Sequence, residues 1–227
     1  MAEQIIYALL GGVIPGIVWL VFWLREDRKK PEPKGLILKT FIFGMLAVVF
    51  VLPLQKFVDM SFPGSTFTAI VLWVLIEEAF KFFAAYFSAL KTREDDDEGV
   101  DQLVYIITAA LGFAALENAL FIFGPLVDGD ILGSILTGNS RFIGAMLLHV
   151  VSSSMVGVML ALTLLRGRFT RFVLGLIGFA GAVTFHTFFN LSLQKGTDSG
   201  MLVAFASVWA GAIVLLLLFE KAKTIAR

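Results

Sequence analysis

Cysteine is absent from this chain of 227 residues. Its absence excludes disulfide bonds, thiolate metal ligands and a cysteine nucleophile, and leaves the redox compartment unspecified. Charge is also scarce: charged residues make up 16% of the chain, and 18 basic residues balance 18 acidic ones. Without net charge or a general basic surface, the protein is not expected to bind nucleic acid.

Apolar residues dominate instead, at 58% of the chain with a mean hydropathy of +0.89. This composition is typical of polytopic helical membrane proteins, and we expect one all-α transmembrane domain over residues 1–227, embedded in the lipid bilayer. Seven segments have the roughly 20 residues needed to cross a bilayer core. They cover residues 4–24, 36–55, 66–90, 102–125, 140–165, 171–193 and 200–219.

Basic residues gather in alternate connections between these segments. The cytoplasmic side of membrane proteins is enriched in lysine and arginine, so this alternation predicts an external N-terminus and a cytoplasmic C-terminus. The acidic start of the chain, MAEQ, indicates an uncleaved first anchor rather than a signal peptide. The basic residues concerned are Arg25, Arg28, Lys29, Lys30 and Lys34, then Lys91 and Arg93, then Arg166, Arg168 and Arg171, and finally Lys221, Lys223 and Arg227.

The third apolar segment, TFTAIVLWVLIEEAFKFFAAYFSALK at 66–91, carries Glu77, Glu78 and Lys81 near its middle. Each charge at the centre of a membrane helix costs roughly 2.5 to 3.5 kcal/mol on insertion scales. Glu77 and Lys81 are four residues apart, so we expect an intrahelical ion pair between them. Glu78 points about 100° away and needs a partner from another helix, a proton or a chemical role.

Other polar residues stand at a similar depth in three more segments. If the predicted topology holds, a rise of about 1.5 Å per residue places titratable groups from four helices in one layer, in the external half of the bilayer. Such agreement favours a shared, water-accessible site over scattered structural hydrogen bonds. The depths from the external ends are about 17 Å for Glu77, about 12 Å for Glu117, about 14 Å for His149 and about 11 Å for His186.

This layer allows several chemistries. A glutamate of the pair could act as a general base, and His186 with Asn190, one turn apart on one face, could donate to an oxyanion during peptide hydrolysis. A divalent metal such as zinc could bind to ligands drawn from Glu77, Glu117, His149 and His186, although no HExxH motif demands it. The same residues could serve a proton-coupled transporter or channel, or could merely pair helices in a protein without turnover.

The motifs together resemble the PrsW-type intramembrane proteases, relatives of the CAAX prenyl-protease and bacteriocin-processing (Abi) membrane peptidases. The resemblance covers most of the chain, and the order of its motifs is more specific than any one of them. They are Glu26, Asp27, Arg28, Pro31, Glu32 and Pro33 in the first connection, Glu77, Glu78 and Lys81 as EExxK, Asp101 and Tyr105, then Gly112, Phe113, Ala114, Glu117 and Asn118 as GFAxxEN, His149, and lastly His186 and Asn190 as HxxxN.

The resemblance implies a peptidase of a bacterial or archaeal cell membrane that cuts a membrane-anchored protein near the extracytoplasmic side, as in site-1 cleavage of an anti-sigma factor. This chain departs from the family pattern at Gln102, Thr187 and Phe189, and we expect these differences to affect substrate preference and local packing. No oligomeric state follows from it. The implied roles are a base from Glu77 and Glu78, positioning of water or a proton by Glu117 and His149, an oxyanion site at His186 and Asn190, and support from Lys81 and Asn118.

Two connections invite functional hypotheses. Residues 124–141, GPLVDGDILGSILTGNSR, are rich in glycine, and we expect a flexible external loop that could gate substrate entry. The acidic stretch over residues 91–101 is expected to be a solvated cytoplasmic loop, with substrate docking as the alternative.

Overall fold

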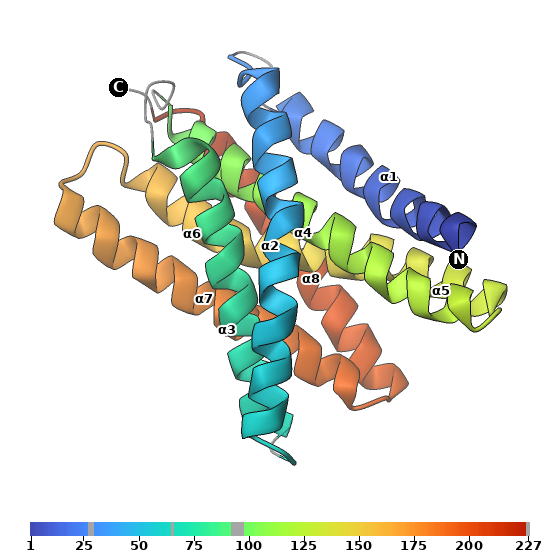
Figure 1. Cartoon of the computed structure of the whole chain (residues 1–227). Helices are drawn as coiled ribbons and strands as arrows, with labels where there is room; N and C mark the ends of the chain where they lie inside the picture. Colours follow the sequence, from blue (N-terminus) through green and yellow to red (C-terminus); the bar gives the residue numbers. More distant parts are fainter. Residues whose placement is uncertain (27–29, 65, 92–97, 226–227) are drawn as a thin grey trace.

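The computed structural model describes residues 1–26, 30–64, 66–91 and 98–225. The described residues form a helical bundle without a β-strand, which confirms the all-α prediction (Figure 1). Asp27 and Arg28 of the first motif, and most of the acidic connection, lie outside the described residues. The helices are α1 (Ala2–Glu26), α2 (Lys34–Ser61), α3 (Thr66–Ala85), α4 (Gly99–Val127), α5 (Ile131–Ser140), α6 (Met146–Leu162), α7 (Arg168–Gln194) and α8 (Asp198–Ala222), with π-helical turns η1 (Tyr86–Leu90) after α3 and η2 (Arg141–Ala145) between α5 and α6.

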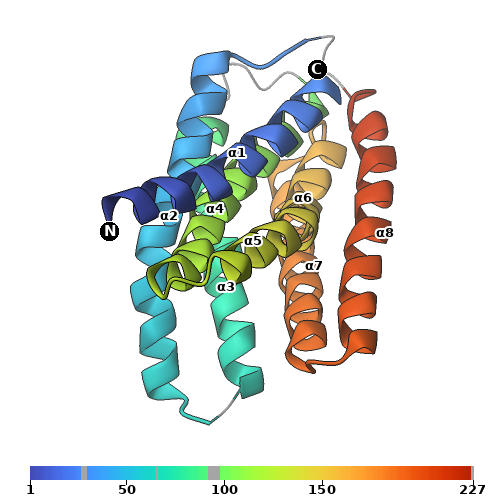
Figure 2. The same ribbon diagram turned by 90° about the vertical axis from the view of Figure 1, so that its right-hand side faces the viewer.

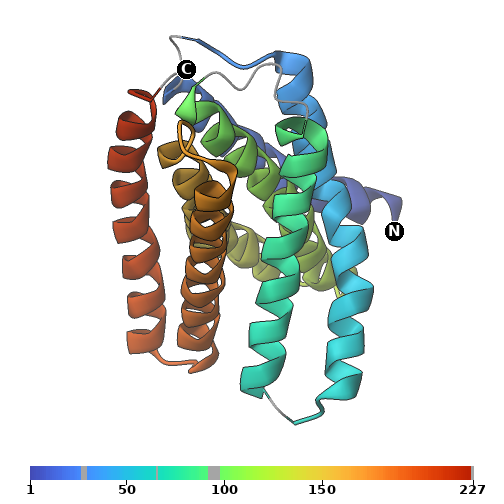
Figure 3. The ribbon, with the colours of Figure 1, turned by 90° about the vertical axis from the view of Figure 1, so that its left-hand side faces the viewer.

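Six spans in the described part of the chain are long and apolar enough to cross a membrane. They are α1, α2, α4, the continuous stretch through α5, η2 and α6, α7 and α8. The seventh predicted segment is α3, whose three central charges separate it from these six in composition. It is nevertheless a 20-residue helix that runs beside α2 (Figures 1 and 3).

Helix α4 is the centre of the bundle and packs against α1, α2, α3 and α6. Its sequence is apolar around most of its circumference, as expected for a helix covered on all sides. Glycines allow the closest approach: a Cβ on Gly112 would collide with the carbonyl oxygen of Phe41 on α2, and one on Gly44 would collide with that of Ala109. The α2 and α4 backbones are therefore in direct contact.

Two helical hairpins, α2–α3 and α7–α8, project from one end of the bundle (Figures 2 and 3). Their turns are separate at that end, and α3 of one hairpin packs against α7 of the other. The turns within both hairpins lie at that end, whereas the α6–α7 connection and the end of α8 lie at the other. This arrangement agrees with the alternation of basic residues along the chain, and the membrane orientation itself stays a prediction.

The prediction of a flexible loop over residues 124–141 is wrong. Helix α4 continues to Val127, and α5 begins at Ile131 after a three-residue turn. The Asp130 side chain caps α5 by accepting a hydrogen bond from the Gly133 amide at 2.8 Å. Helix formation also satisfies the backbone hydrogen bonds internally, which an apolar environment requires more strongly than the glycines oppose it.

Candidate active site

Polar side chains from α3, α4, α6 and α7 converge where the two hairpins meet. The sequence placed these groups in one layer, and the distances below join them into one continuous network, although their catalytic roles stay predictions. The predicted residues within it are Glu77, Glu78 and Lys81 of α3, Glu117 and Asn118 of α4, His149 of α6 and His186 of α7.

Glu78 is almost fully buried, and its carboxylate accepts hydrogen bonds from four side chains. Four donors compensate well for the burial of a charge, so Glu78 has the partners from other helices that the sequence required. The donors are Lys81 Nζ at 2.6 Å, His186 Nδ1 at 2.7 Å, Ser153 Oγ at 2.7 Å and Ser152 Oγ at 2.9 Å.

The expected Glu77–Lys81 pair is wrong, because Lys81 pairs with Glu78 at a spacing of three residues. The Lys81 ammonium also lies 2.9 Å from Nδ1 of His149 on α6. Partners on neighbouring helices therefore decide which glutamate the lysine reaches, since both spacings are available on an isolated helix.

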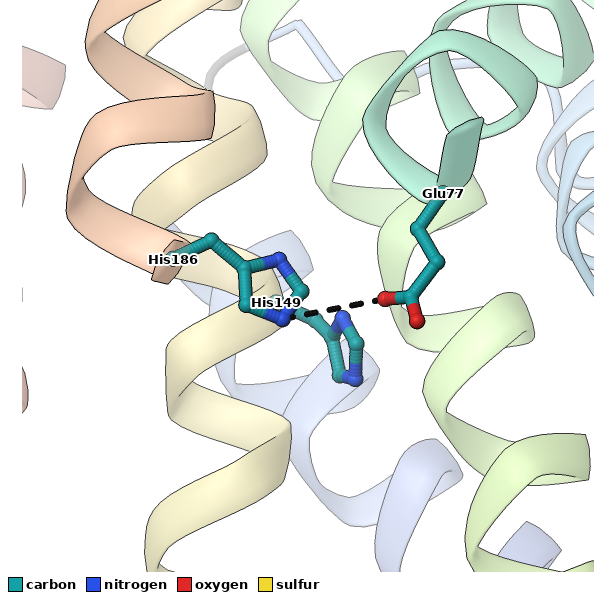
Figure 4. Close-up of side chains that lie close together, drawn as sticks. All are labelled: Glu77, His149 and His186. Carbon is teal, nitrogen blue, oxygen red and sulfur yellow. Dashed lines mark ion pairs between the residues drawn. The ribbon is translucent and has the colours of Figure 1, made fainter. Parts of the chain in front are cut away.

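Glu77 has a different environment. Its Oε1 accepts a hydrogen bond from Gln55 Nε2 of α2 at 2.7 Å. Its Oε2 is buried without a hydrogen-bond partner among the described residues and lies 3.7 Å from His186 Nε2. Figure 4 shows this oxygen facing the His186 ring, with the His149 ring beside the line that joins them.

The tautomers of both histidines can be assigned from their partners. His186 Nδ1 donates to the Glu78 carboxylate, so in the neutral ring Nε2 carries the lone pair and faces Glu77. An ammonium group can only donate, so His149 Nδ1 accepts from Lys81 and its Nε2–H donates to Glu117 Oε2 at 2.9 Å.

A metal ion fits the group formed by Glu77, His149 and His186. All three are buried, and one ligand atom of each lies within 4.8 Å of the other two. Two imidazoles and a carboxylate are a known catalytic zinc set, and a zinc-binding histidine usually donates its second ring N–H to a carboxylate, as His186 does to Glu78. Glu77 Oε2 has no hydrogen-bond partner in the described part of the chain, and His186 Nε2 faces it at 3.7 Å, so both atoms are available as ligands. His149 would exchange the hydrogen bond that its Nδ1 accepts from Lys81 for the ion and keep the one from Nε2–H to Glu117.

Glu117, the fourth metal candidate, lies outside that group of three. Its Oε2 accepts from both His149 Nε2 and Arg141 Nη2, and its Oε1 has no hydrogen-bond partner among the described residues. Arg141 also donates through Nε to Asn118 Oδ1 at 2.5 Å, and its guanidinium lies 3.8 Å from the centre of the Phe121 ring. The sequence analysis missed Arg141 because it stood at the end of the supposed loop; its isolation among uncharged residues was the available signal.

A cavity of about 1150 Å³ opens between the two hairpins and reaches this network. Asn190, half-buried and one turn beyond His186, lines the cavity as the predicted oxyanion donor would, whereas Glu78 and Lys81 lie behind its wall. The network residues that reach the cavity are Gln55, Glu77, Glu117, Arg141, His149 and His186.

Comparisons with known proteins point to one family. Residues 32–218 match the family described as PrsW family intramembrane metalloprotease. Protease PrsW of Geobacillus kaustophilus is 31% identical over 134 residues, which cover 57% of this chain and 58% of that protein. Protease PrsW of Bacillus subtilis is 29% identical over 161 residues, which cover 70% of this chain and 68% of that protein. No solved structure matches the chain.

The match thus spans less than two thirds of the Geobacillus protein's length. The relatives are bacterial, and the apolar helices are long enough to cross a bilayer, so this chain is an integral protein of a bacterial membrane. The relation to the CAAX and Abi peptidases is not tested by these matches and stays a prediction.

Proposed function

Because the chain belongs to the PrsW family of intramembrane metalloproteases, we propose that it hydrolyses a peptide bond of a membrane-anchored protein at the centre formed by Glu77, His149 and His186. The observation that carries this proposal is the buried group of two histidines and a carboxylate beside a large cavity. Zinc is the ion that this ligand set fits best. An anti-sigma factor is the substrate class implied by the resemblance, and it belongs to this proposal.

When bound, a zinc ion supplies Lewis-acid activation of water and of the scissile carbonyl. Glu77, His149 and His186 hold the ion, and Glu78 keeps the His186 ring oriented through its bond to Nδ1. The Asn190 amide donates a hydrogen bond to the oxyanion that develops on the scissile carbonyl oxygen.

Glu117 is the general base in this proposal. Its Oε2 is fixed by His149 and Arg141, while Oε1 is free to accept a proton from water and pass it to the leaving amine. Glu78, which the sequence analysis considered for this role, is occupied by four donors and does not line the cavity.

The family match favours peptide hydrolysis over the proton-coupled transporter or channel considered from the sequence. The two functions are separated by reconstituting the purified protein in proteoliposomes with a membrane-anchored test substrate. We expect a cleaved product from the wild type, none from His186→Ala, and no proton or ion flux from either. Flux without cleavage would support transport and would contradict the proposal.

A further inference from the structure

Gln55 contacts the centre from a helix that contributes none of the predicted site residues. It lies on α2, two residues beyond Pro53, and its side-chain Nε2 donates to Glu77 Oε1 at 2.7 Å. Neither the charge pattern nor the family motifs singled it out, because glutamine near the end of a membrane helix is unremarkable in sequence.

The Gln55 backbone makes a second contact between the same helices. Its carbonyl oxygen accepts a hydrogen bond from Trp73 Nε1 of α3 at 3.3 Å. Gln55 is therefore tied to α3 at two points, one through Trp73 and one through Glu77. Of these two contacts, only the side-chain hydrogen bond reaches the Glu77 carboxylate.

The amide acts on only one oxygen of Glu77. Because Oε1 is held by Gln55, the carboxylate is turned with Oε2 toward His186 Nε2, 3.7 Å away, and that oxygen has no partner in the described part of the chain. A neutral donor preserves the negative charge of the carboxylate, which a metal ligand needs. Residues that orient metal ligands in this way typically change metal affinity by about 10- to 100-fold when replaced.

We propose that Gln55 is a positioning residue of the metal centre: its side-chain amide holds Glu77 so that Oε2 is presented to the ion together with His186 Nε2. This inference rests on the proposed function, since it requires that Glu77 bind the ion. The Gln55 amide orients Glu77 by a hydrogen bond, as the Glu78 carboxylate orients His186.

The test is the zinc affinity of the purified full-length protein, stripped of metal and titrated with zinc against a chromogenic chelator. Gln55→Leu removes the donor at similar volume, and we expect about 10- to 100-fold weaker binding. Trp73→Phe is the matched control, because it removes the other tie between Gln55 and α3 without touching Glu77. Its affinity should stay within about threefold of the wild type, well below the effect of losing a ligand-orienting group.

Cleavage gives a second readout that a merely structural role would not produce. Gln55→Leu should lose activity at limiting zinc and recover it at saturating zinc, because the ligands themselves are intact. An unchanged zinc affinity in Gln55→Leu, or an equal loss in Trp73→Phe, would overturn the inference while leaving the metal centre in place. Zinc binding that is unaffected by Glu77→Gln would instead overturn the proposed centre and the inference together.

Discussion

Glu77 and Glu78 are neighbours in sequence, but their carboxylates have different surroundings. Glu78 is held by four donors, one of them the buried Lys81 ammonium, whereas within the described residues Glu77 has one neutral donor and one oxygen without a hydrogen bond. A carboxylate that balances a buried charge supports the fold, and one with an unused buried oxygen is suited to bind a ligand.

The two glutamates should therefore respond differently to neutralisation. Glu78→Gln leaves the Lys81 ammonium buried without its counter-charge, which typically costs about 3 to 5 kcal/mol. Glu77→Gln should lower the stability of the metal-free protein by clearly less, because it leaves no buried lysine without its counter-charge. Unfolding of both metal-free variants in detergent measures the difference, and equal stabilities would contradict the assignment.

Glu117 should separate catalysis from metal binding. Glu117→Gln keeps the shape of the side chain but removes the base, so we expect kcat to fall by about 100- to 10,000-fold. Zinc affinity should fall by no more than about 10- to 100-fold, because Glu117 supports the ligand His149 but lies outside the group of three, so kcat is compared at saturating zinc. Parallel measurements of cleavage and zinc binding test this, with Glu77→Gln as the comparison that should lose both. Full activity in Glu117→Gln would exclude it as the base.

At the scale of elements, the π-helical turn η2 brings Arg141 from the end of α5 to Glu117 and Asn118. The planar guanidinium contacts both residues at once, which a lysine ammonium does less well. We expect Arg141→Met to lower kcat about 100-fold through misplacement of Glu117, and Arg141→Lys to have an intermediate effect. Wild-type kcat in both variants would show that Glu117 holds its position without this contact.

Helices α2 and α4 depend on glycine for their close contact. Gly112→Ala would force the two backbones apart at Phe41, and overpacking of this kind costs about 1 to 3 kcal/mol. Gly124→Ala in the same helix is the matched control, because its added Cβ would meet nothing within 4 Å. Thermal unfolding of both variants should show a lower Tm only for Gly112→Ala; a similar Tm for both would contradict this packing.

The extent of prediction from sequence differs between the elements and the site. Apolar length and alternating basic connections predicted the seven long helices that the described residues form, and they predicted one depth for Glu77, Glu117, His149 and His186, because both signals follow from the bilayer. The sequence did not predict α5, because its glycines indicated a loop. In apolar surroundings, with Asp130 as the N-terminal cap, the same residues form a helix. Both signals also missed Gln55 and Arg141, whose contacts cross between helices and leave no periodicity in the sequence.

For the whole molecule, the central prediction is the orientation in the membrane. Both ends of α7 are exposed: Lys195 precedes the α7–α8 turn, and Arg166 lies in the α6–α7 connection at the opposite end. Since the chain has no cysteine, a single introduced cysteine is the only thiol that can react with a maleimide. Lys195→Cys should react with a membrane-impermeant maleimide on intact cells, and Arg166→Cys only after permeabilisation. The reverse pattern would invert the topology and place the cavity mouth on the cytoplasmic side.

The measurement that tests the account most directly is a zinc titration of metal-stripped wild-type protein, with bound zinc and cleavage of a membrane-anchored substrate followed together. We predict that cleavage is absent in the stripped protein and rises in proportion to bound zinc up to one ion per chain. Glu77→Gln should neither bind zinc at this site nor gain activity. Full cleavage by the stripped protein in the presence of a strong chelator would contradict a metal centre at Glu77, His149 and His186.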